Sequence, residues 1–195
     1  MAMPLPADEG TALPAWEKDS ATNVSARLKA RAEQGDAETQ NRLGNMYYHG
    51  DGIQKNHKLA AHWFDKAAEQ GYAPGQFNLA RLYRQGKGVE QDYGRAVHWY
   101  RKAAEQGLVI AQFFLGKSYA EGQGISKDPI LAYRWLHRAA IQGDADAQWA
   151  RDRLLKTLSP QQLAEVQARN IAKTPKRGAT EIDKKKSGGG GGGGG

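Results

Sequence analysis

A repeated step of 36 residues limits the possible folds of this 195-residue chain more than any other feature. The segments HWFDKAAEQG, HWYRKAAEQG and RWLHRAAIQG occupy residues 62–71, 98–107 and 134–143. Single residue types recur at the same step without insertion, in four columns: Gly35, Gly71, Gly107 and Gly143; Trp63, Trp99 and Trp135; Tyr47, Tyr83 and Tyr119; Gln40, Gln76, Gln112 and Gln148. A unit of this length cannot bury its own apolar side chains, whereas stacked copies bury a continuous core. The chain is therefore predicted to be a stack of small repeats.

Each repeat is predicted to contain two α-helices. The first has inward-facing positions at helical spacing, such as Leu43, Gly44 and Tyr47, and ends at a glycine such as Gly50. The second begins after a side chain that can accept from first-turn N–H groups, at Asn56, Asp92 and Asp128. Its apolar stripe contains the tryptophan column, and no segment shows the alternation of a strand. The predicted fold class is all-α, a right-handed α-solenoid of helix-turn-helix repeats with a 36-residue period.

The second repeat resembles a known family. Its sequence QFNLARLYRQGKGVEQDYGRAVHWYRKAAEQG (76–107) matches almost throughout the pattern ALGxxYxxGxGVxxDxxxAxxWYxxAAxxG of the Sel1-like repeat, a relative of the tetratricopeptide repeat (TPR). TPR units step by about 34 residues, and the two extra residues here fall in the glycine-rich loop between the helices. The resemblance implies a binding scaffold.

These patterns divide the chain into predicted parts. They are a flexible segment 1–20, a half-unit 21–34, full repeats 35–70, 71–106 and 107–142, a partial unit 143–158, a capping helix 159–172, and a basic, glycine-rich flexible tail 173–195. Ser159 and Gln162 form a predicted capping box at the start of the last helix. Leu163, Val166 and Ile171 form an apolar stripe that could cover the open end of the stack.

Composition and charge exclude several classes of function. The chain has no cysteine, which rules out disulfides and thiolate metal sites. Most of the net charge of +7 lies in the tail, where Lys184, Lys185 and Lys186 are consecutive, so nucleic-acid binding is disfavoured. The sequence contains no run of 18 apolar residues, so membrane insertion is not expected, and the first residues lack the features of a signal peptide. We expect a cytoplasmic protein if the chain is complete, and a periplasmic or secreted one if a leader was removed.

No catalytic residue, metal ligand or cofactor is predicted. The segments GDG, GKG and GQG follow helices and lack the remaining residues of a phosphate loop. The five histidines never form the i, i+4 arrangement of a zinc helix. No serine is accompanied by a repeated histidine and carboxylate, as nucleophilic catalysis needs. The protein is therefore predicted not to be an enzyme.

A candidate binding surface follows if the first helices pack as their TPR counterparts do. The positions facing the concave groove then include an aromatic row, a basic row four residues further on, and two additional residues. The rows are Asn41, Phe77, Phe113 and Trp149, then Asn45, Arg81, Lys117 and Arg153, and the additional residues are Tyr48 and Arg84. Such a surface suits a partner segment with aromatic or apolar anchors and carboxylates. In the alternative interpretation, the aromatic row covers the neighbouring helix.

The function predicted from these features is a non-catalytic scaffold or adaptor that binds a partner protein or peptide in the concave groove. Because some bacterial members of the family neutralise secreted toxins, the alternative is a bacterial inhibitor or immunity protein. Nucleic-acid binding through the basic tail is less favoured, and we expect a monomer.

Overall fold

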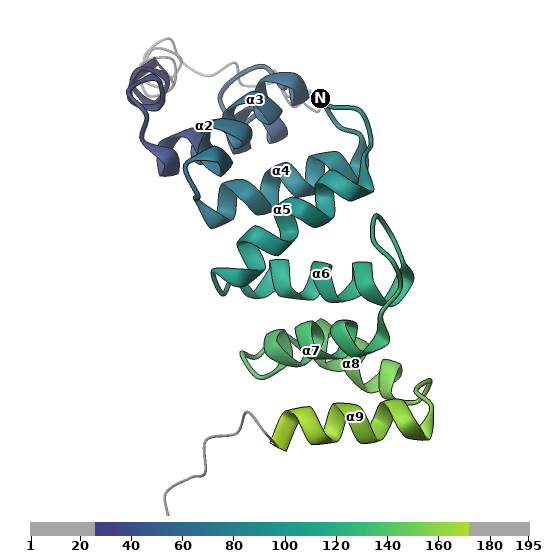
Figure 1. The fold of residues 1–195 in the computed structure, drawn as a ribbon. Helices are drawn as coiled ribbons and strands as arrows, with labels where there is room; N and C mark the ends of the chain where they lie inside the picture. The colour runs from purple at the N-terminus through teal and green to yellow at the C-terminus, as the bar shows by residue number, and fades with distance from the viewer. Residues whose placement is uncertain (1–25, 172–195) are drawn as a thin grey trace, which may run out of the picture. The chain divides into compact units, whose positions relative to one another are not determined.

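The computed structural model describes residues 26–171, with side chains to residue 168, and the regular secondary structure of this part is all α-helix (Figure 1). Residues 26–33 are helical, and they are followed by α2 (Ala37–His49), α3 (His57–Glu69), α4 (Ala73–Gln85), α5 (Tyr93–Glu105), α6 (Val109–Glu121), α7 (Pro129–Ala140), α8 (Ala145–Leu155) and α9 (Pro160–Ile171). The predicted all-α class is confirmed. The described part of the chain divides into two compact units between Thr157 and Leu158, and α9 belongs to the second.

The second helices of the repeats begin, and the first helices end, at the residues that the sequence indicates. Asn56, Asp92 and Asp128 cap α3, α5 and α7, and the Asp92 carboxylate accepts from the backbone N–H of Arg95 at 2.9 Å. Gly50 ends α2 in the left-handed conformation, with φ of 90°, as do the equivalent glycines after α4 and α6. The predicted helix boundaries in the repeats are thus set by local capping chemistry.

Helices that follow one another in the sequence pack against one another. α2 packs on α3, α4 on α5 and α6 on α7 within repeats, while α3 packs on α4, α5 on α6 and α7 on α8 between them. Apart from Leu82, the largest fully buried side chains recur at the repeat step: Leu43, Leu79 and Leu115 on the first helices, Phe64, Tyr100 and Leu136 on the second. Trp63 is buried, whereas Trp99 and Trp135 are partly buried and pack against the central core cluster. The core is thus shared between neighbours, as predicted for a repeat stack.

The column of glutamines forms a hydrogen-bond network that the sequence did not reveal. The Nε2 of Gln76 on α4 donates to the carbonyl of Ala68 on α3 at 3.3 Å, and its Oε1 accepts from Gln106 after α5 at 2.8 Å. Gln40 and Gln112 make equivalent pairs of bonds. Each buried glutamine therefore links its own helix to the preceding helix and to the end of the following one. Gln148, the fourth member of the column, is exposed.

In two interhelical loops, the second residue of the glycine pair must be glycine, because the backbone of a neighbouring helix lies very close to it. Gly88 and Gly124 have φ of 73° and 69°, and a Cβ added to either would collide with the carbonyl oxygen at the start of the preceding repeat's second helix, at His57 or Tyr93. The loop of one repeat thus lies directly on the helix of the repeat before it.

In the second unit, the predicted capping box is present. The backbone N–H of Ser159 donates to Gln162 Oε1 at 2.9 Å, and the N–H of Gln162 donates to Ser159 Oγ at 3.3 Å. Val166 is buried and Leu163 half-buried, while the side chain of Ile171 lies outside the described part. A role for this stripe in covering the stack stays a prediction. The predicted flexible segments 1–20 and 173–195 also lie outside the described residues.

Candidate functional site

All ten predicted binding residues lie on the first helices of the repeats and of the partial unit. α2 carries Asn41, Asn45 and Tyr48; α4 carries Phe77, Arg81 and Arg84; α6 carries Phe113 and Lys117; α8 carries Trp149 and Arg153. Apart from Trp149 and Arg153, which are exposed, all of them are half-buried. Because their burial differs, the two rows do not form one uniform surface.

The ring of Tyr48 contacts two positively charged side chains of the next repeat. The guanidinium carbon of Arg81 lies 4.5 Å from the centre of the Tyr48 ring, and Lys87 Nζ lies 5.2 Å from it. Lys87 also donates to the Tyr48 hydroxyl at 3.1 Å, and this hydroxyl donates to Gln85 Oε1 at 3.2 Å. The end of α2 is therefore tied to α4 and to the loop after it by a positively charged cluster.

The positive charges of this cluster lower the pKa of Tyr48. Burial raises the pKa of the phenol, but the hydrogen bond from Lys87 and the positive charges of Arg81, Lys87 and Lys55 outweigh burial. The pKa of Tyr48 therefore lies below its ordinary value, because the surrounding cations favour the phenolate. Three positively charged side chains therefore surround Tyr48.

Arg84 forms a second contact of the same kind, between α4 and α6. Its guanidinium carbon lies 4.9 Å from the centre of the Phe114 ring, which stacks on Tyr100 at 5.3 Å with an interplanar angle of 12°. Tyr100 is fully buried and its hydroxyl has no hydrogen-bond partner among the described residues. Burial raises the pKa of Tyr100, and the charges of Arg84 and Arg81 oppose that shift. Both guanidinium groups therefore lie near this hydroxyl.

The cations of α4 and its following loop are not neutralised by the described part of the chain. Arg81, Arg84 and Lys87 form no ion pair there, whereas Lys117 pairs with Glu121 at 3.7 Å. The Nε atoms of Arg81 and Arg84 are buried and have no hydrogen-bond partner among these residues. We call Tyr48, Arg81, Arg84, Lys87 and Phe114 the cation–aromatic strip. The strip therefore has positive charge that no acidic side chain among the described residues neutralises.

Most side chains of the aromatic row are less exposed than those of a protruding binding surface would be. Phe77 lies 5.8 Å from both Tyr100 and Phe114, and Phe113 packs against the cluster around Leu136. In the middle of the molecule the row therefore covers neighbouring helices, as the alternative interpretation proposed. Only at the α8 end is an aromatic of this row widely exposed, because Trp149 is 64% accessible.

Asn41, Lys117 and Arg153 have local partners. Asn41 accepts from Asn78 Nδ2 at 2.8 Å. Lys117 and Arg153 lie over aromatic rings of their own helices, at 5.8 Å from Phe113 and 5.2 Å from Trp149. These two i, i+4 pairs match the predicted adjacency of the two rows.

Sequence reasoning missed three participants in the site. Lys87 lies in the GKG loop, which was examined only as a fragment of a phosphate loop, and Phe114 directly follows a predicted row position. Tyr100 occupies the same repeat position as Phe64 and Leu136. A hydroxyl at this core position was the sequence feature that could have indicated a polar contact there. Residues 26–168 contain no group of three or more acidic or histidine side chains placed to hold a metal ion. No helix among the described residues is long and apolar enough to cross a membrane.

The model of the Sel1 repeat family matches residues 37–72, 73–108 and 109–144, which is more than half of the chain. The chain belongs to the Sel1 repeat family. Repeats of this family generally serve as scaffolds for protein–protein interaction. No curated protein sequence matches the chain.

Solved structures of repeat proteins are similar to this Sel1 repeat chain. A protective antigen of uropathogenic Escherichia coli with an SLR fold is 44% identical, with a TM-score of 0.62 over 64% of this chain and 27% of the antigen. The chain thus spans about a quarter of the antigen's length. A Sel1 repeat protein from Oxalobacter formigenes is 37% identical, with a TM-score of 0.61 over 66% of this chain and 96% of that protein. The cysteine-rich protein B of Helicobacter pylori, 22% identical with a TM-score of 0.54 over 72% of this chain and 98% of its own, shares the fold.

Proposed function

We propose that this chain is a non-catalytic scaffold that binds an acidic segment of a partner protein along the cation–aromatic strip. The observation that carries the proposal is a set of three cations, Arg81, Arg84 and Lys87, which are held against aromatic rings and form no ion pair with the described residues. Membership of a family of interaction scaffolds supports the same conclusion.

The geometry of the strip favours carboxylates over neutral ligands. Arg81 and Arg84 lie one helical turn apart on α4 and are oriented by the rings of Tyr48 and Phe114, so little side-chain entropy is lost when they bind. A guanidinium group can donate two parallel hydrogen bonds to one carboxylate, and such charge-assisted bonds are stronger than neutral ones.

Apolar anchoring is available at the other end of the same set of helices. Trp149 on α8 is exposed and carries Arg153 over its ring. An exposed tryptophan beside an arginine is typical of binding hot spots. A partner segment with carboxylates and an aromatic or aliphatic side chain would use both regions.

The test begins with the full chain immobilised against a displayed library of random short peptides. The selected peptides are expected to be enriched in aspartate and glutamate and to contain an aromatic residue. Calorimetric titration of one selected peptide should show that Arg81→Ala and Arg84→Ala each weaken binding by about 2 kcal/mol or more. Arg81→Lys should recover only part of the loss, because lysine cannot bind a carboxylate through a planar fork.

Matched controls remove a positive charge elsewhere. Lys58 and Lys66 are exposed on α3, and Lys58→Ala and Lys66→Ala should change binding by no more than about 0.5 kcal/mol. Equal losses in the controls and the strip variants would contradict the proposed site. Enrichment of basic or uncharged peptides would contradict the proposed partner chemistry. Tight binding of random single-stranded nucleic acid with a steep salt dependence would instead assign the cations to phosphates.

A further inference from the structure

Residues 1–20 lie outside the described part of the chain, and their sequence has the chemistry that the cation–aromatic strip is proposed to select. Four carboxylates and one lysine give them a net charge of −3, and two large apolar side chains stand between the two acidic pairs. The carboxylates are those of Asp8, Glu9, Glu17 and Asp19, the lysine is Lys18, and the apolar residues are Leu13 and Trp16. We call residues 8–19 the acidic segment.

The strip has the opposite charge, and its cations are grouped on one helix and the loop after it. Arg81, Arg84 and Lys87 form no ion pair with the described residues. Arg81 and Lys87 contact the same ring, at 4.5 and 5.2 Å from the centre of Tyr48. Arg84 follows Arg81 by one turn of α4. Like charges held close together repel one another, so carboxylates beside them would stabilise this arrangement.

The spacing of two carboxylates in the acidic segment suits the spacing of the two arginines. Residues two apart in an extended chain, as Glu17 and Asp19 are, project from the same side at about 6–7 Å from each other. Residues three apart on a helix, as Arg81 and Arg84 are, have Cβ atoms about 5–6 Å apart. One carboxylate can therefore face each guanidinium group and accept two parallel hydrogen bonds from it.

The acidic segment joins the described chain at the level of Tyr48. Gln40 Nε2 on α2 donates to the carbonyl of Ala32, in the preceding helix, at 3.0 Å, and helices joined by so short a loop run antiparallel. From this contact, Ala26 lies about 9 Å back along its helix and Tyr48 lies about 12 Å on along α2, in the same direction. Residues 20–25 connect the segment to Ala26 and span up to about 20 Å when extended. The segment is thus tethered within reach of Tyr48 and its cations.

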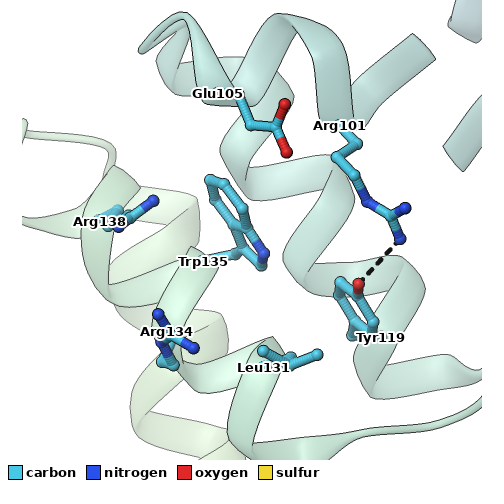
Figure 2. Close-up of a pocket in the computed structure, with 7 residues that line it drawn as sticks. All are labelled: Arg101, Glu105, Tyr119, Leu131, Arg134, Trp135 and Arg138. Atoms are coloured by element: carbon cyan, nitrogen blue, oxygen red, sulfur yellow. Dashed lines mark hydrogen bonds between the residues drawn. The ribbon is translucent and has the colours of Figure 1, made fainter. Parts of the chain in front are cut away.

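A second group of arginines is a poorer match for an acidic segment. Arg101, Arg134 and Arg138 line a pocket between α5, α6 and α7, together with the carboxylate of Glu105. Figure 2 shows Arg101 and Arg138 on opposite sides of the Trp135 ring. The positive charge of this pocket is therefore divided between separate walls, and Glu105 offsets part of it.

We propose that the acidic segment binds the cation–aromatic strip of its own chain and competes there with the acidic segment of a partner protein. This inference rests on the proposed function of the strip and adds a form of regulation to it. A short tether gives the segment an effective concentration on the order of millimolar, so weak contacts are enough to occupy the strip. The apparent affinity for a partner then falls in proportion to the fraction of chains whose strip is free.

A spin label in the full chain tests where the acidic segment binds. Because the chain has no cysteine, Ala12→Cys creates a single attachment site for a nitroxide. In NMR spectra, we expect the nitroxide to broaden the backbone amide signals of Arg81, Arg84 and Lys87, relative to the reduced label. The matched control is Ala179→Cys in the basic tail, whose label should leave these signals sharp.

Further variants show whether the broadening depends on the strip. Arg81→Gln and Arg84→Gln together should abolish it, whereas Arg134→Gln and Arg138→Gln, in the pocket of Figure 2, should not change it. Far-UV circular dichroism establishes that each variant is folded. Isotopically labelled chain mixed with spin-labelled, unenriched chain should show no broadening. Broadening in that mixture would assign the occupant of the strip to a second copy and overturn the proposal.

Peptide affinity tests the competition. In the full chain, Asp8→Asn, Glu9→Gln, Glu17→Gln and Asp19→Asn together should tighten binding of a selected acidic peptide at least about fivefold, as expected if the strip is free in no more than about a fifth of unmodified chains. The matched control removes four exposed carboxylates from the repeats, with Glu33→Gln, Glu38→Gln, Glu69→Gln and Glu105→Gln. It should tighten binding less than about twofold, because salt screens distant charges. An equal gain in both variants would show an effect of net charge alone and overturn the competition.

The outcomes separate this inference from the proposed function. If selected peptides bind the strip but the label at residue 12 broadens none of its signals, the inference is overturned and the proposed function stands. If the label broadens the strip signals but no displayed peptide binds, the inference stands and the proposed partner binding fails. Broadening confined to residues 173–195 would place the acidic segment on the basic tail and also overturn the inference.

Discussion

Two boundaries between repeats, α3–α4–α5 and α5–α6–α7, have the same framework and different polar side chains. Each has a tryptophan on its last helix, Trp99 or Trp135, with a cation over the ring, Lys102 at 4.6 Å or Arg138 at 4.8 Å. Each also has a tyrosine on its middle helix, Tyr83 or Tyr119. The framework follows the 36-residue step throughout.

The polar residues around that framework differ in charge and in hydrogen bonding. Tyr119 accepts from Arg101 at 3.0 Å, on the first helix of its boundary, whereas Tyr83 accepts from Arg95 at 3.4 Å, on the last helix of its boundary. At the position of Arg101 the earlier boundary has Asp65, whose pKa is raised by burial and by the charge of Glu69. The comparison shows that apolar repetition specifies the scaffold, while departures from repetition give each boundary its own chemistry.

The largest expected effect concerns the shared tryptophans. Trp99→Ala and Trp135→Ala should each lower the free energy of unfolding by about 3 kcal/mol or more, since both rings pack on the core cluster. Urea unfolding followed by circular dichroism measures the loss. A loss below about 1 kcal/mol for either variant would mean that the two boundaries do not share one framework.

A smaller effect is expected for the glutamine column. Gln76→Ala should cost about 1–3 kcal/mol, because it removes two hydrogen bonds made by a buried side chain, to the Ala68 carbonyl and from the Gln106 amide. Gln148→Ala is the matched control, since this member of the column is exposed, and it should be nearly neutral. Equal unfolding midpoints for the two variants would contradict the linking role of the buried glutamines.

The smallest effect concerns Asp65. Because burial raises its pKa in the folded state, the ionised carboxylate disfavours folding at neutral pH, and this cost disappears as the pH falls through the raised pKa. Asp65→Asn should therefore stabilise the protein at pH 7 by at most about 0.5 kcal/mol. The gain should vanish toward about pH 4, where an ordinary aspartate protonates. Thermal unfolding across this range measures it, and a destabilised variant at pH 7 would show that Asp65 has a favourable partner.

Local rules of helix formation made much of the fold predictable. The caps at Asn56, Asp92 and Asp128 and the left-handed glycine at Gly50 depend on residues close in sequence, and the structure has them where the sequence indicates. The site was predictable in part: Tyr48, Arg81 and Arg84 meet aromatic or cationic partners. Their partners Lys87 and Phe114 were missed because they lie off the repeat columns used to find the rows.

The sequence by itself determined the repeat length, the helices and the inward-facing columns, because periodic apolar spacing and capping act within a few residues. Tertiary structure decided which polar groups meet across repeats. Gln76 reaches Gln106, Arg84 reaches Phe114 and Arg101 reaches Tyr119 only when three helices pack together. The rotation of one helix on the next sets which side chains meet, and that rotation results from side-chain packing along the whole contact, which no short stretch of sequence specifies.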